Sequence, residues 1–289
     1  MEETRSDLRS KRVHRLALLL IWEGRLSRAR LREIYGLSPV RASEWLREFR
    51  DSYPGWTVWE SKPKSYRASE EAYREWREGV SNVAGAQDSE FADYLSQVGL
   101  SAADLAASGE PTWSAFRDFS TPAPRVFATL RTAIEQRRTV ELTYRSMREP
   151  APHKRLIEPH SLVRAGRRWH IRGYSTTNGD FRDYSLGRIV SVRARDDEAQ
   201  HGVEDDAAWQ TAARVAIVAH PRLSQPQAEV VRFEYFQGTA SRIENCRGAL
   251  VPYLVQDLRA ATDTKVQLPP DYQLAVGNIK EVSRWLFPT

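Results

Sequence analysis

The amino-acid sequence predicts an α+β, multidomain protein. Its 289 residues exceed the ~250 at which globular chains tend to divide into separate cores. Apolar residues recur at helical spacing near the N-terminus, whereas residues 139–195 alternate between apolar and polar and are interrupted by glycines. Because these patterns occupy different regions, we expect separate structural units at residues 1–80, 81–121, 122–200 and 204–289.

The first unit has the order of a helix-turn-helix. Apolar residues three and four apart predict a first helix, which Gly24 interrupts. A second, shorter helix ends at Gly36, and Ser38 and Pro39 then provide an N-cap and a first helical position for a third helix over 40–51. The apolar residues of the first helix are Val13, Leu16, Ala17 and Leu20.

The third predicted helix is followed by a hairpin, so the unit is predicted to be a winged helix-turn-helix. Residues 56–59 and 65–66 form the hairpin strands, and two lysines occupy its tip. A polar helix face beside a basic wing is suited to a DNA duplex. The inward helix residues are Ala42, Trp45, Leu46 and Phe49. The predicted DNA-binding residues are Ser38, Val40, Arg41, Ser43, Arg47, Lys62, Lys64 and Ser65.

An alternative for this unit is a small three-helix domain that binds protein, because helical periodicity alone does not exclude one. The basic wing tip and the polar face of the third helix favour DNA. Trp56 and Trp59 are predicted to pack within the wing and not to stack on bases.

Residues 81–121 are predicted to form a helical connector of small and acidic residues, with a helical pattern from Phe91 to Val98. Two prolines in 121–124 mark a boundary. The third unit begins beyond this boundary, with an amphipathic helix over 126–134 that leads into a strand over 139–144.

Residues 139–195 predict a small, strongly bent sheet or barrel. Alternation along 168–174 places Trp169 and Ile171 on one face and His170 and Arg172 on the other, so one strand provides an apolar core and a cationic face. Residues 141–195 contain twelve Lys and Arg against five Asp and Glu, and residues 1–80 contain seventeen against thirteen. Two separate basic regions predict two anionic partners.

At these residues the chain resembles a known family, the WYL-domain transcriptional regulators, and in particular the BrxR and CapW type that controls bacterial anti-phage defence operons. The resemblance covers nearly the whole chain and is most specific in the third unit. Trp169-His170-Ile171 takes the place of the triplet that gives the family its name. The resemblance implies an Sm-like or SH3-like β-barrel between the winged helix-turn-helix and a C-terminal extension. The other matching segments are Tyr144-Arg145-Ser146, Arg155, Pro159-His160, Arg172 and residues 181–189.

The resemblance implies a ligand pocket in this barrel. Several guanidinium groups with a hydroxyl and an aromatic ring suit an anionic effector, a nucleotide or an oligonucleotide. At position 170 a histidine replaces the tyrosine of the family name, so hydrogen bonding replaces direct ring stacking there. Arg193 and Arg195 are predicted to be solvated. The implied pocket residues are Tyr144, Ser146, Arg155, His170, Arg172 and Arg188, with His160 and Arg182 added.

The fourth unit is predicted to be a small α+β module. Strands are expected over 214–218 and 273–276, and helices over 226–236, around 250–258 and at the C-terminus. Pro252 leaves the start of the second helix open. The resemblance implies that this module forms a homodimer. Its apolar residues could belong to that interface or to a core: Val230, Val231, Phe233, Tyr235 and Phe236.

The sequence contains little that indicates catalysis. Ser146, His170 and Asp183 could be a nucleophile, a base and an orienting group, but they lack a nucleophile elbow or a diagnostic spacing. The six histidines and the single Cys246 show no metal-ligand spacing, and no glycine-rich phosphate loop occurs. We therefore expect no enzyme, no cofactor and no metal, and, since no signal peptide or membrane span is evident, a cytoplasmic protein.

Together these features predict a homodimeric transcriptional regulator, a repressor of an anti-phage defence operon, that binds an inverted repeat in double-stranded DNA and is released by an anionic ligand. Matching symmetry of protein and operator is the reason to expect the inverted repeat. An alternative is a protein that binds or processes single-stranded nucleic acid with the barrel. A hydrolase that uses Ser146 is a further alternative.

Overall fold

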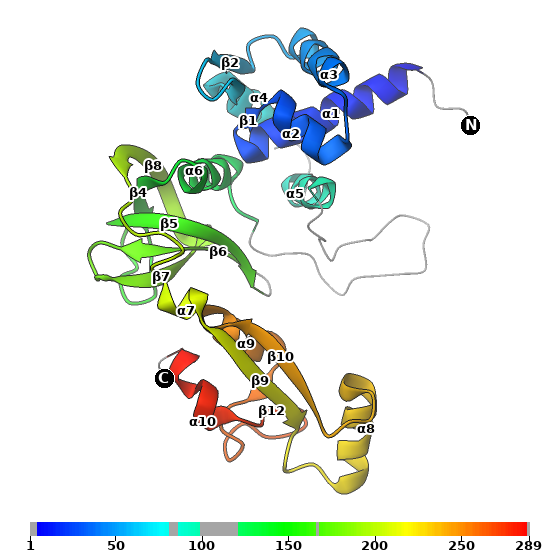
Figure 1. Ribbon diagram of the computed structural model, residues 1–289, viewed down its shortest axis with the longest axis vertical. Coiled ribbons are helices and arrows are strands. Elements are labelled where there is room, and N and C mark those ends of the chain that lie inside the picture. The colour runs from blue at the N-terminus through cyan, green and yellow to red at the C-terminus, as the bar shows by residue number, and fades with distance from the viewer. Residues whose placement is uncertain (1–4, 81–85, 99–120, 166–167, 288–289) are drawn as a thin grey trace.

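The computed structural model describes residues 5–80, 86–98, 121–165 and 168–287. Three parts follow one another along its long axis: an N-terminal winged domain, a middle sheet covered by one helix, and a C-terminal module (Figure 1). The winged domain and the middle sheet share one continuous hydrophobic core, whereas the C-terminal module has a core of its own. None of the described helices is long and apolar enough to cross a lipid bilayer.

The winged domain confirms the predicted helix-turn-helix and hairpin. Ser27 and Ser38 cap the second and third helices through their side-chain oxygens, and Gly36 ends the second helix in the left-handed conformation. The three strands pair in the order β1-β3-β2. The elements are α1 (Arg5–Glu23), β1 (Arg25–Leu26), α2 (Arg28–Tyr35), α3 (Pro39–Ser52), β2 (Thr57–Glu60), β3 (Ser65–Ala68) and α4 (Glu70–Val80).

Helix α1 is buried on all sides over its C-terminal half. The side chains from Leu16 to Trp22 are essentially inaccessible, because α2 and α3 cover one side of the helix and α5 (Ala86–Gln97) and α6 (Pro124–Glu135) cover the other (Figure 1). The Trp22 ring lies 4.4 Å from the ring of Phe91 in α5 and 6.2 Å from that of Phe127 in α6. Both of these rings also contact Trp169 of the middle sheet. The aromatic contacts therefore join the winged domain to the middle sheet.

The predicted helical connector is described only in part. Helix α5 confirms its helical pattern and packs against α1. Residues 81–85 and 99–120, to which the prediction also extended, lie outside the described residues.

The middle sheet is antiparallel throughout, with the strand order β7-β6-β5-β4-β8. Among the described residues no pairing joins the edge strands β7 and β8, so the Sm-like or SH3-like barrel is not confirmed. At Gly173 an added Cβ would lie 2.5 Å from the backbone oxygen of Glu158, so only glycine fits beside the bulge in β5. The strands are β4 (Arg138–Tyr144), β5 (His153–Ala165), β6 (Arg168–Ser175), β7 (Asp180–Ser185) and β8 (Ile189–Glu198).

The C-terminal module is an α+β unit with a sheet in the order β10-β9-β12-β11. The predicted strands and main helices are present, but β10 and β11 were not predicted. Pro252 lies in the first turn of α9, where its missing N–H costs no hydrogen bond. The elements are α7 (Ala207–Gln210), β9 (Ala212–Ala219), α8 (Gln225–Phe236), β10 (Ser241–Arg247), α9 (Val251–Asp257), β11 (Ala260–Ala261), β12 (Leu274–Val276) and α10 (Ile279–Val282).

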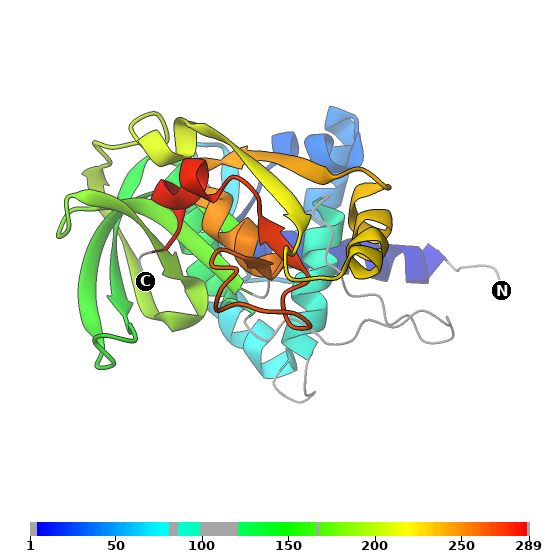
Figure 2. The same ribbon diagram turned by 90° about the horizontal axis from the view of Figure 1, so that it is seen from below.

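Helix α8 lies at the end of the C-terminal module that is remote from the middle sheet (Figure 1, Figure 2). Its apolar residues divide into two sets. Val231 and Phe236 are buried in the module's core, whereas Val230, Phe233 and Tyr235 are exposed. The exposed set leaves an apolar surface on a domain whose core is already formed without it.

Candidate functional site

A groove lined by cations lies between the recognition helix α3 and the wing. We call it the basic groove and define it by Arg28, Arg47, Arg50 and Lys64. It comprises a hollow of about 210 Å³ beside the wing and a more open one of about 430 Å³ on the outer face of α3. The other residues that line the two hollows are Ser27, Pro39, Val40, Ser43, Glu44, Leu46, Trp59 and Tyr66.

Most residues predicted to bind DNA lie at or near this groove. Val40, Ser43, Arg47 and Lys64 line it and are exposed. Ser38, Arg41 and Lys62 are exposed beside it, but Arg41 lies 3.6 Å from Glu44 in an ion pair.

One residue of the wing is placed differently from the prediction. Ser65 is only 1% exposed, because its side chain points into the winged domain at the start of β3, so it is not available to DNA. Trp56 is buried, and its indole N–H donates to Glu75 at 2.8 Å. Trp59 packs on Tyr66 within the wing, as predicted, but it is 50% exposed and also lines the groove.

Sequence reasoning missed Arg28, Arg50 and Tyr66. Arg50 follows Arg47 by one turn of α3, so extending the outer face of the helix by three residues would have found it. The Arg50 guanidinium donates to the Tyr66 hydroxyl at 3.1 Å and lies 4.9 Å from the ring centre, while the Trp59 ring lies 4.9 Å from that of Tyr66. The stack of Arg50, Tyr66 and Trp59 fixes the wing beside α3. No sequence pattern gave the position of Arg28 relative to α3.

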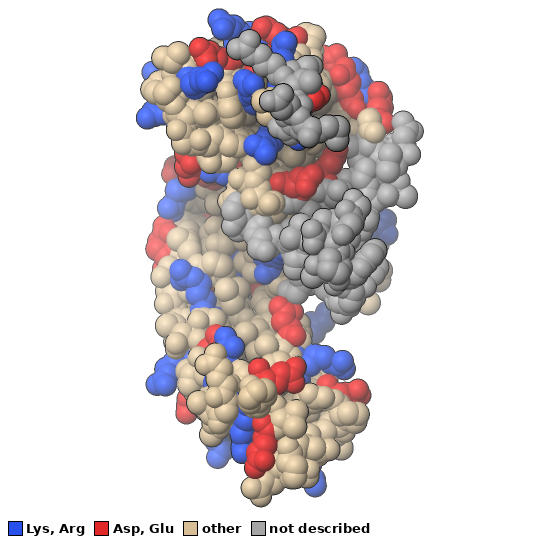
Figure 3. Space-filling view, turned by 90° about the vertical axis from the view of Figure 1, so that its right-hand side faces the viewer, with Lys and Arg blue, Asp and Glu red and all other residues tan. Residues whose placement is uncertain are grey.

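The face of the molecule in Figure 3 shows Lys and Arg interspersed with Asp and Glu along its whole length. The small net charge of +5 is therefore not concentrated on that face. In the basic groove, by contrast, four cations face a single carboxylate, Glu44, which Arg41 already pairs. The groove thus carries a local excess of positive charge.

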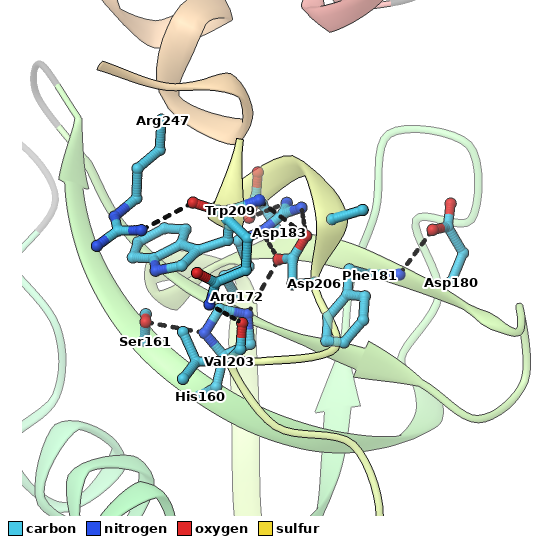
Figure 4. Close-up of polar contacts among 12 residues, drawn as sticks. His160, Ser161, Arg172, Asp180, Phe181, Asp183, Val203, Asp206, Trp209 and Arg247 are labelled. Atoms are coloured by element: carbon cyan, nitrogen blue, oxygen red, sulfur yellow. Dashed lines mark hydrogen bonds and ion pairs between the residues drawn. The ribbon is translucent and has the colours of Figure 1, made fainter. Parts of the chain in front are cut away.

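Arg172 and His160, two of the predicted ligand residues, lie in an internal ion cluster (Figure 4). The Arg172 guanidinium donates to both carboxylate oxygens of Asp206, at 2.5 and 3.0 Å, and to Asp183 at 3.1 Å. His160 Nε2 lies 3.1 Å from Asp206, and the Tyr253 hydroxyl donates to Asp183 at 2.8 Å. We call these five residues the Asp206 cluster.

Asp206 is 1% exposed and is the N-cap of α7, where it also accepts from the Trp209 backbone N–H. Burial acts to raise the pKa of its carboxyl, but hydrogen bonds from His160 and Arg172 outweigh burial and hold that pKa well below its usual range. Since α7 opens the C-terminal module, the cluster attaches this module to the middle sheet. The charge of Arg172 is balanced by the protein's own carboxylates, so Arg172 is not presented to an anion as predicted.

The eight predicted ligand residues do not converge on one pocket. In the register of β6 and β7, Arg172 lies opposite Asp183 and Arg182 opposite Gly173. Residues directly opposite each other share a face of the sheet, and successive residues alternate, so Arg182 lies on the other face from Arg172. Alternation within β6 was predicted, but its register against β7 was not, which is why the two arginines were placed together.

The remaining predicted ligand residues fall near one face or the other. Tyr144 is buried, with its ring 5.2 Å from that of Tyr184. Arg155 forms an ion pair with Glu149. The backbone N–H of Glu149 donates to Ser146 Oγ at 2.9 Å. His170 lies nearer the Asp206 cluster, with its ring 5.0 Å from that of Tyr253, and Arg188 is close enough for its charge to act on His170. Burial lowers the pKa of His170, Asp183 opposes that shift, and the charges of Arg168 and Arg188 lower it further.

The arrangement gives no support to a hydrolase. Ser146 Oγ is bonded within its own turn, and Asp183 accepts from Arg172 and Tyr253. No hydrogen bond among the described residues joins Ser146, His170 and Asp183 into a chain. Within the same described ranges, no group of three or more His, Cys, Asp or Glu is placed to hold a metal ion.

Family models match the chain in three segments. Residues 9–78 match the winged helix-turn-helix domain of the BrxR transcriptional regulator, residues 125–194 the WYL domain, and residues 212–282 the C-terminal dimerization domain of BrxR. The three matches follow the same order as the three parts of the fold.

Curated relatives align over nearly the whole chain. The chain is 28% identical over 285 residues to the DNA-binding transcriptional repressor CapW of Escherichia coli (strain KTE188), covering 94% of this chain and 90% of the relative. It is 26% identical over 283 residues to CapW of Pseudomonas aeruginosa, with the same coverage, and 24% identical over 288 residues to CapW of Stenotrophomonas maltophilia, covering 96% and 92%. The chain therefore belongs to the WYL-domain transcriptional regulators of the BrxR and CapW type.

Proposed function

We propose that this protein is a homodimeric, sequence-specific DNA-binding transcriptional repressor. The observation that carries the proposal is the basic groove, in which α2, α3 and the wing together present four cations and an exposed apolar side chain, Val40. Relatives that align over nearly the whole chain are named DNA-binding transcriptional repressors.

The groove has the chemistry that a duplex requires. Helix α3 enters the major groove, where Arg47 donates to base edges and Val40 contacts apolar groups such as the thymine methyl. Arg50 near the end of α3, Arg28 of α2 and Lys64 of the wing bind backbone phosphates, which position the domain without reading sequence. Trp59 and Tyr66 give the wing a rigid apolar surface beside these contacts.

The repressor acts as a dimer, and we place the contact between protomers on the exposed apolar surface of α8. This helix belongs to the segment that matches the dimerization domain. Phe233 is 82% exposed, although a monomer gains nothing by exposing so large an apolar side chain. Two copies related by a twofold axis would bury it and would match an inverted repeat in the operator.

We expect Phe233→Ser to convert the dimer to monomer at micromolar concentration. Losing a central aromatic anchor costs about 2 kcal/mol of association free energy, a roughly thirtyfold weaker dimer. Sedimentation equilibrium measures the dissociation constant. Val266→Ser is the matched control, because Val266 is also exposed in the same module but lies outside α8. Equal dimer affinity for the wild type and Phe233→Ser would contradict this interface.

We further propose that the repressor controls an anti-phage defence operon and is released by an anionic ligand, a nucleotide or an oligonucleotide. The residues best placed to receive it are Tyr144, Ser146, Arg155 and Arg182. Arg182 is exposed, and Arg155 pairs with an exposed carboxylate, Glu149, in an ion pair that solvent weakens and a phosphate can replace. The ligand acts by binding more tightly to the form that does not fit the operator.

The test is a mobility-shift titration in which the purified protein is added to the promoter region that adjoins its own gene. We expect the protein to shift this duplex and to prefer it over either of its single strands. Short oligonucleotides added to the complex should release the duplex, and Arg182→Ala should blunt this release, whereas the control Arg193→Ala, exposed on β8, should not. Preference for single strands would contradict the repressor and favour the single-strand-binding alternative.

A further inference from the structure

The carboxylate of Glu23, at the end of α1, contacts side chains from three other helices in different parts of the chain. Glu23 is the last residue of α1 and is 1% exposed. Arg30 of α2 donates to both of its oxygens, at 2.7 and 3.0 Å. Arg131 of α6 lies 3.4 Å from the carboxylate, and the Tyr94 hydroxyl of α5 lies 3.5 Å from it.

A buried carboxylate is costly unless ion pairs and hydrogen bonds replace the water it loses. Here the compensation comes from two arginines on opposite sides of α1. Arg30 belongs to the helix that directly precedes the recognition helix, whereas Arg131 belongs to the helix that covers the middle sheet. Breaking either contact raises the cost of burying Glu23, so the carboxylate favours the arrangement in which both helices stay in place.

The backbone beside Glu23 adds a close contact to this joint. Gly24 adopts the left-handed conformation, with φ of 75°, and a Cβ there would lie 3.3 Å from the Cβ of Ala128 in α6. The chain therefore leaves α1 in tight contact with α6 and turns directly into β1 and α2. The position of α2 is thus set by contacts with the middle domain as well as by those within the winged domain.

We propose that Glu23 is a positioning residue for operator binding: with Arg30 and Arg131 it holds α2, and through α2 the recognition helix, at one orientation relative to the middle sheet. This inference rests on the proposed function and extends it. Glu23 does not touch DNA. It acts because a dimer binds an inverted repeat tightly only when both recognition helices are held at the spacing of the two half-sites.

The cleanest variant is Arg131→Gln, which removes the contact with α6 and leaves Arg30 to neutralise Glu23. Arg125→Gln is the matched control. Arg125 lies on the same helix and also reaches the winged domain, but its pair with Glu70 of α4 is exposed on both sides. Glu23→Gln, which weakens both contacts, should behave like Arg131→Gln if it folds.

Binding of the full-length variants is measured by fluorescence anisotropy on two duplexes of equal length, one with both half-sites and one with a single half-site. We expect Arg131→Gln to weaken binding to the full operator roughly tenfold, because the gain from simultaneous engagement depends on geometry, and to leave half-site affinity within about twofold. The variant should also tolerate one inserted base pair between half-sites better than the wild type. Arg125→Gln should change neither affinity.

Hydrogen exchange of the DNA-free proteins tests the joint separately from the proposed function. We expect amides of residues 25–36 to exchange faster in Arg131→Gln than in Arg125→Gln, with residues 212–236 unchanged. Unaltered exchange over 25–36, or an equal loss of half-site and full-site affinity, would overturn the positioning role. If the wild type binds neither duplex while the exchange result holds, the repressor function fails and the joint stands.

Discussion

Replacing Arg47 by alanine is expected to weaken operator binding by about 1–3 kcal/mol. Replacing both Arg28 and Arg47 by alanine should cause a larger loss of binding free energy. Arg47 lines both hollows of the basic groove and is exposed, so its guanidinium is free to donate to base edges in the major groove. Arg28 lines the same hollows. Anisotropy titrations at several salt concentrations give the affinity and its salt dependence.

The two arginines should be distinguishable in such titrations. Losing a phosphate contact at Arg28 makes the negative slope of log binding constant against log salt concentration shallower by about 0.9. Losing a base contact at Arg47 instead reduces the discrimination between operator and unrelated DNA. Arg74→Ala is the control, because Arg74 is an exposed arginine of the same domain that lies on α4 beside Glu71. If Arg28→Ala and Arg47→Ala bind as well as Arg74→Ala, the basic groove is not the DNA-binding surface.

Asp206→Ala should destabilise the protein by about 3–5 kcal/mol, the usual cost of breaking a buried ion pair by removing one partner. The change leaves the buried Arg172 with only one carboxylate, Asp183, and leaves His160 Nε2 facing no acceptor at that position. Urea unfolding followed by circular dichroism measures the loss. Asp205→Ala is the control. The Asp205 carboxylate is adjacent in sequence but exposed, and it accepts one backbone N–H, a hydrogen bond worth about 1 kcal/mol.

The contribution of Asp206 also depends on pH in a defined direction. Because the pKa of Asp206 in the folded protein lies below its ordinary value of 3.8, folding favours the ionised carboxylate. Its stabilisation is therefore complete above that ordinary value and is lost as the pH falls through the folded-state pKa. The stability difference between wild type and Asp206→Ala should be constant from neutral pH down to about pH 5 and shrink in acid. A difference that grew in acid would contradict the assigned charge state.

Local signals predicted the winged domain well. Ser38, Pro39 and Gly36 set the ends of α2 and α3 through backbone preferences that each residue carries by itself. The α+β module was predicted for the same reason, with β10 missed because its alternation is broken by charged residues on both sides. Local signals could not predict that α1 is buried on two sides. Its helical period indicates one buried face, whereas α5 and α6 bury the other.

The candidate sites show the same limit. The outer face of α3 follows from helix geometry alone, so Val40, Ser43 and Arg47 were found. The ligand residues depended on strand register and on carboxylates distant in sequence. Asp206 neutralises Arg172 across 34 residues, and no pattern within either segment indicates the contact. The burial of Glu23 could not be predicted from the sequence, because a single acidic residue at a helix end gives no sign of it.

The continuous core from α1 to the middle sheet bears on how the chain matures during synthesis. At roughly 5–20 residues per second, the ribosome needs about 7–30 s to proceed from Trp22 to Trp169. Until α6 and the middle sheet have been synthesised, the side of α1 that carries Trp22 lacks neighbours that it has in the folded protein. A nascent chain in this state exposes an apolar helix surface to holdase chaperones. We therefore expect these chaperones to bind the emerging N-terminal segment.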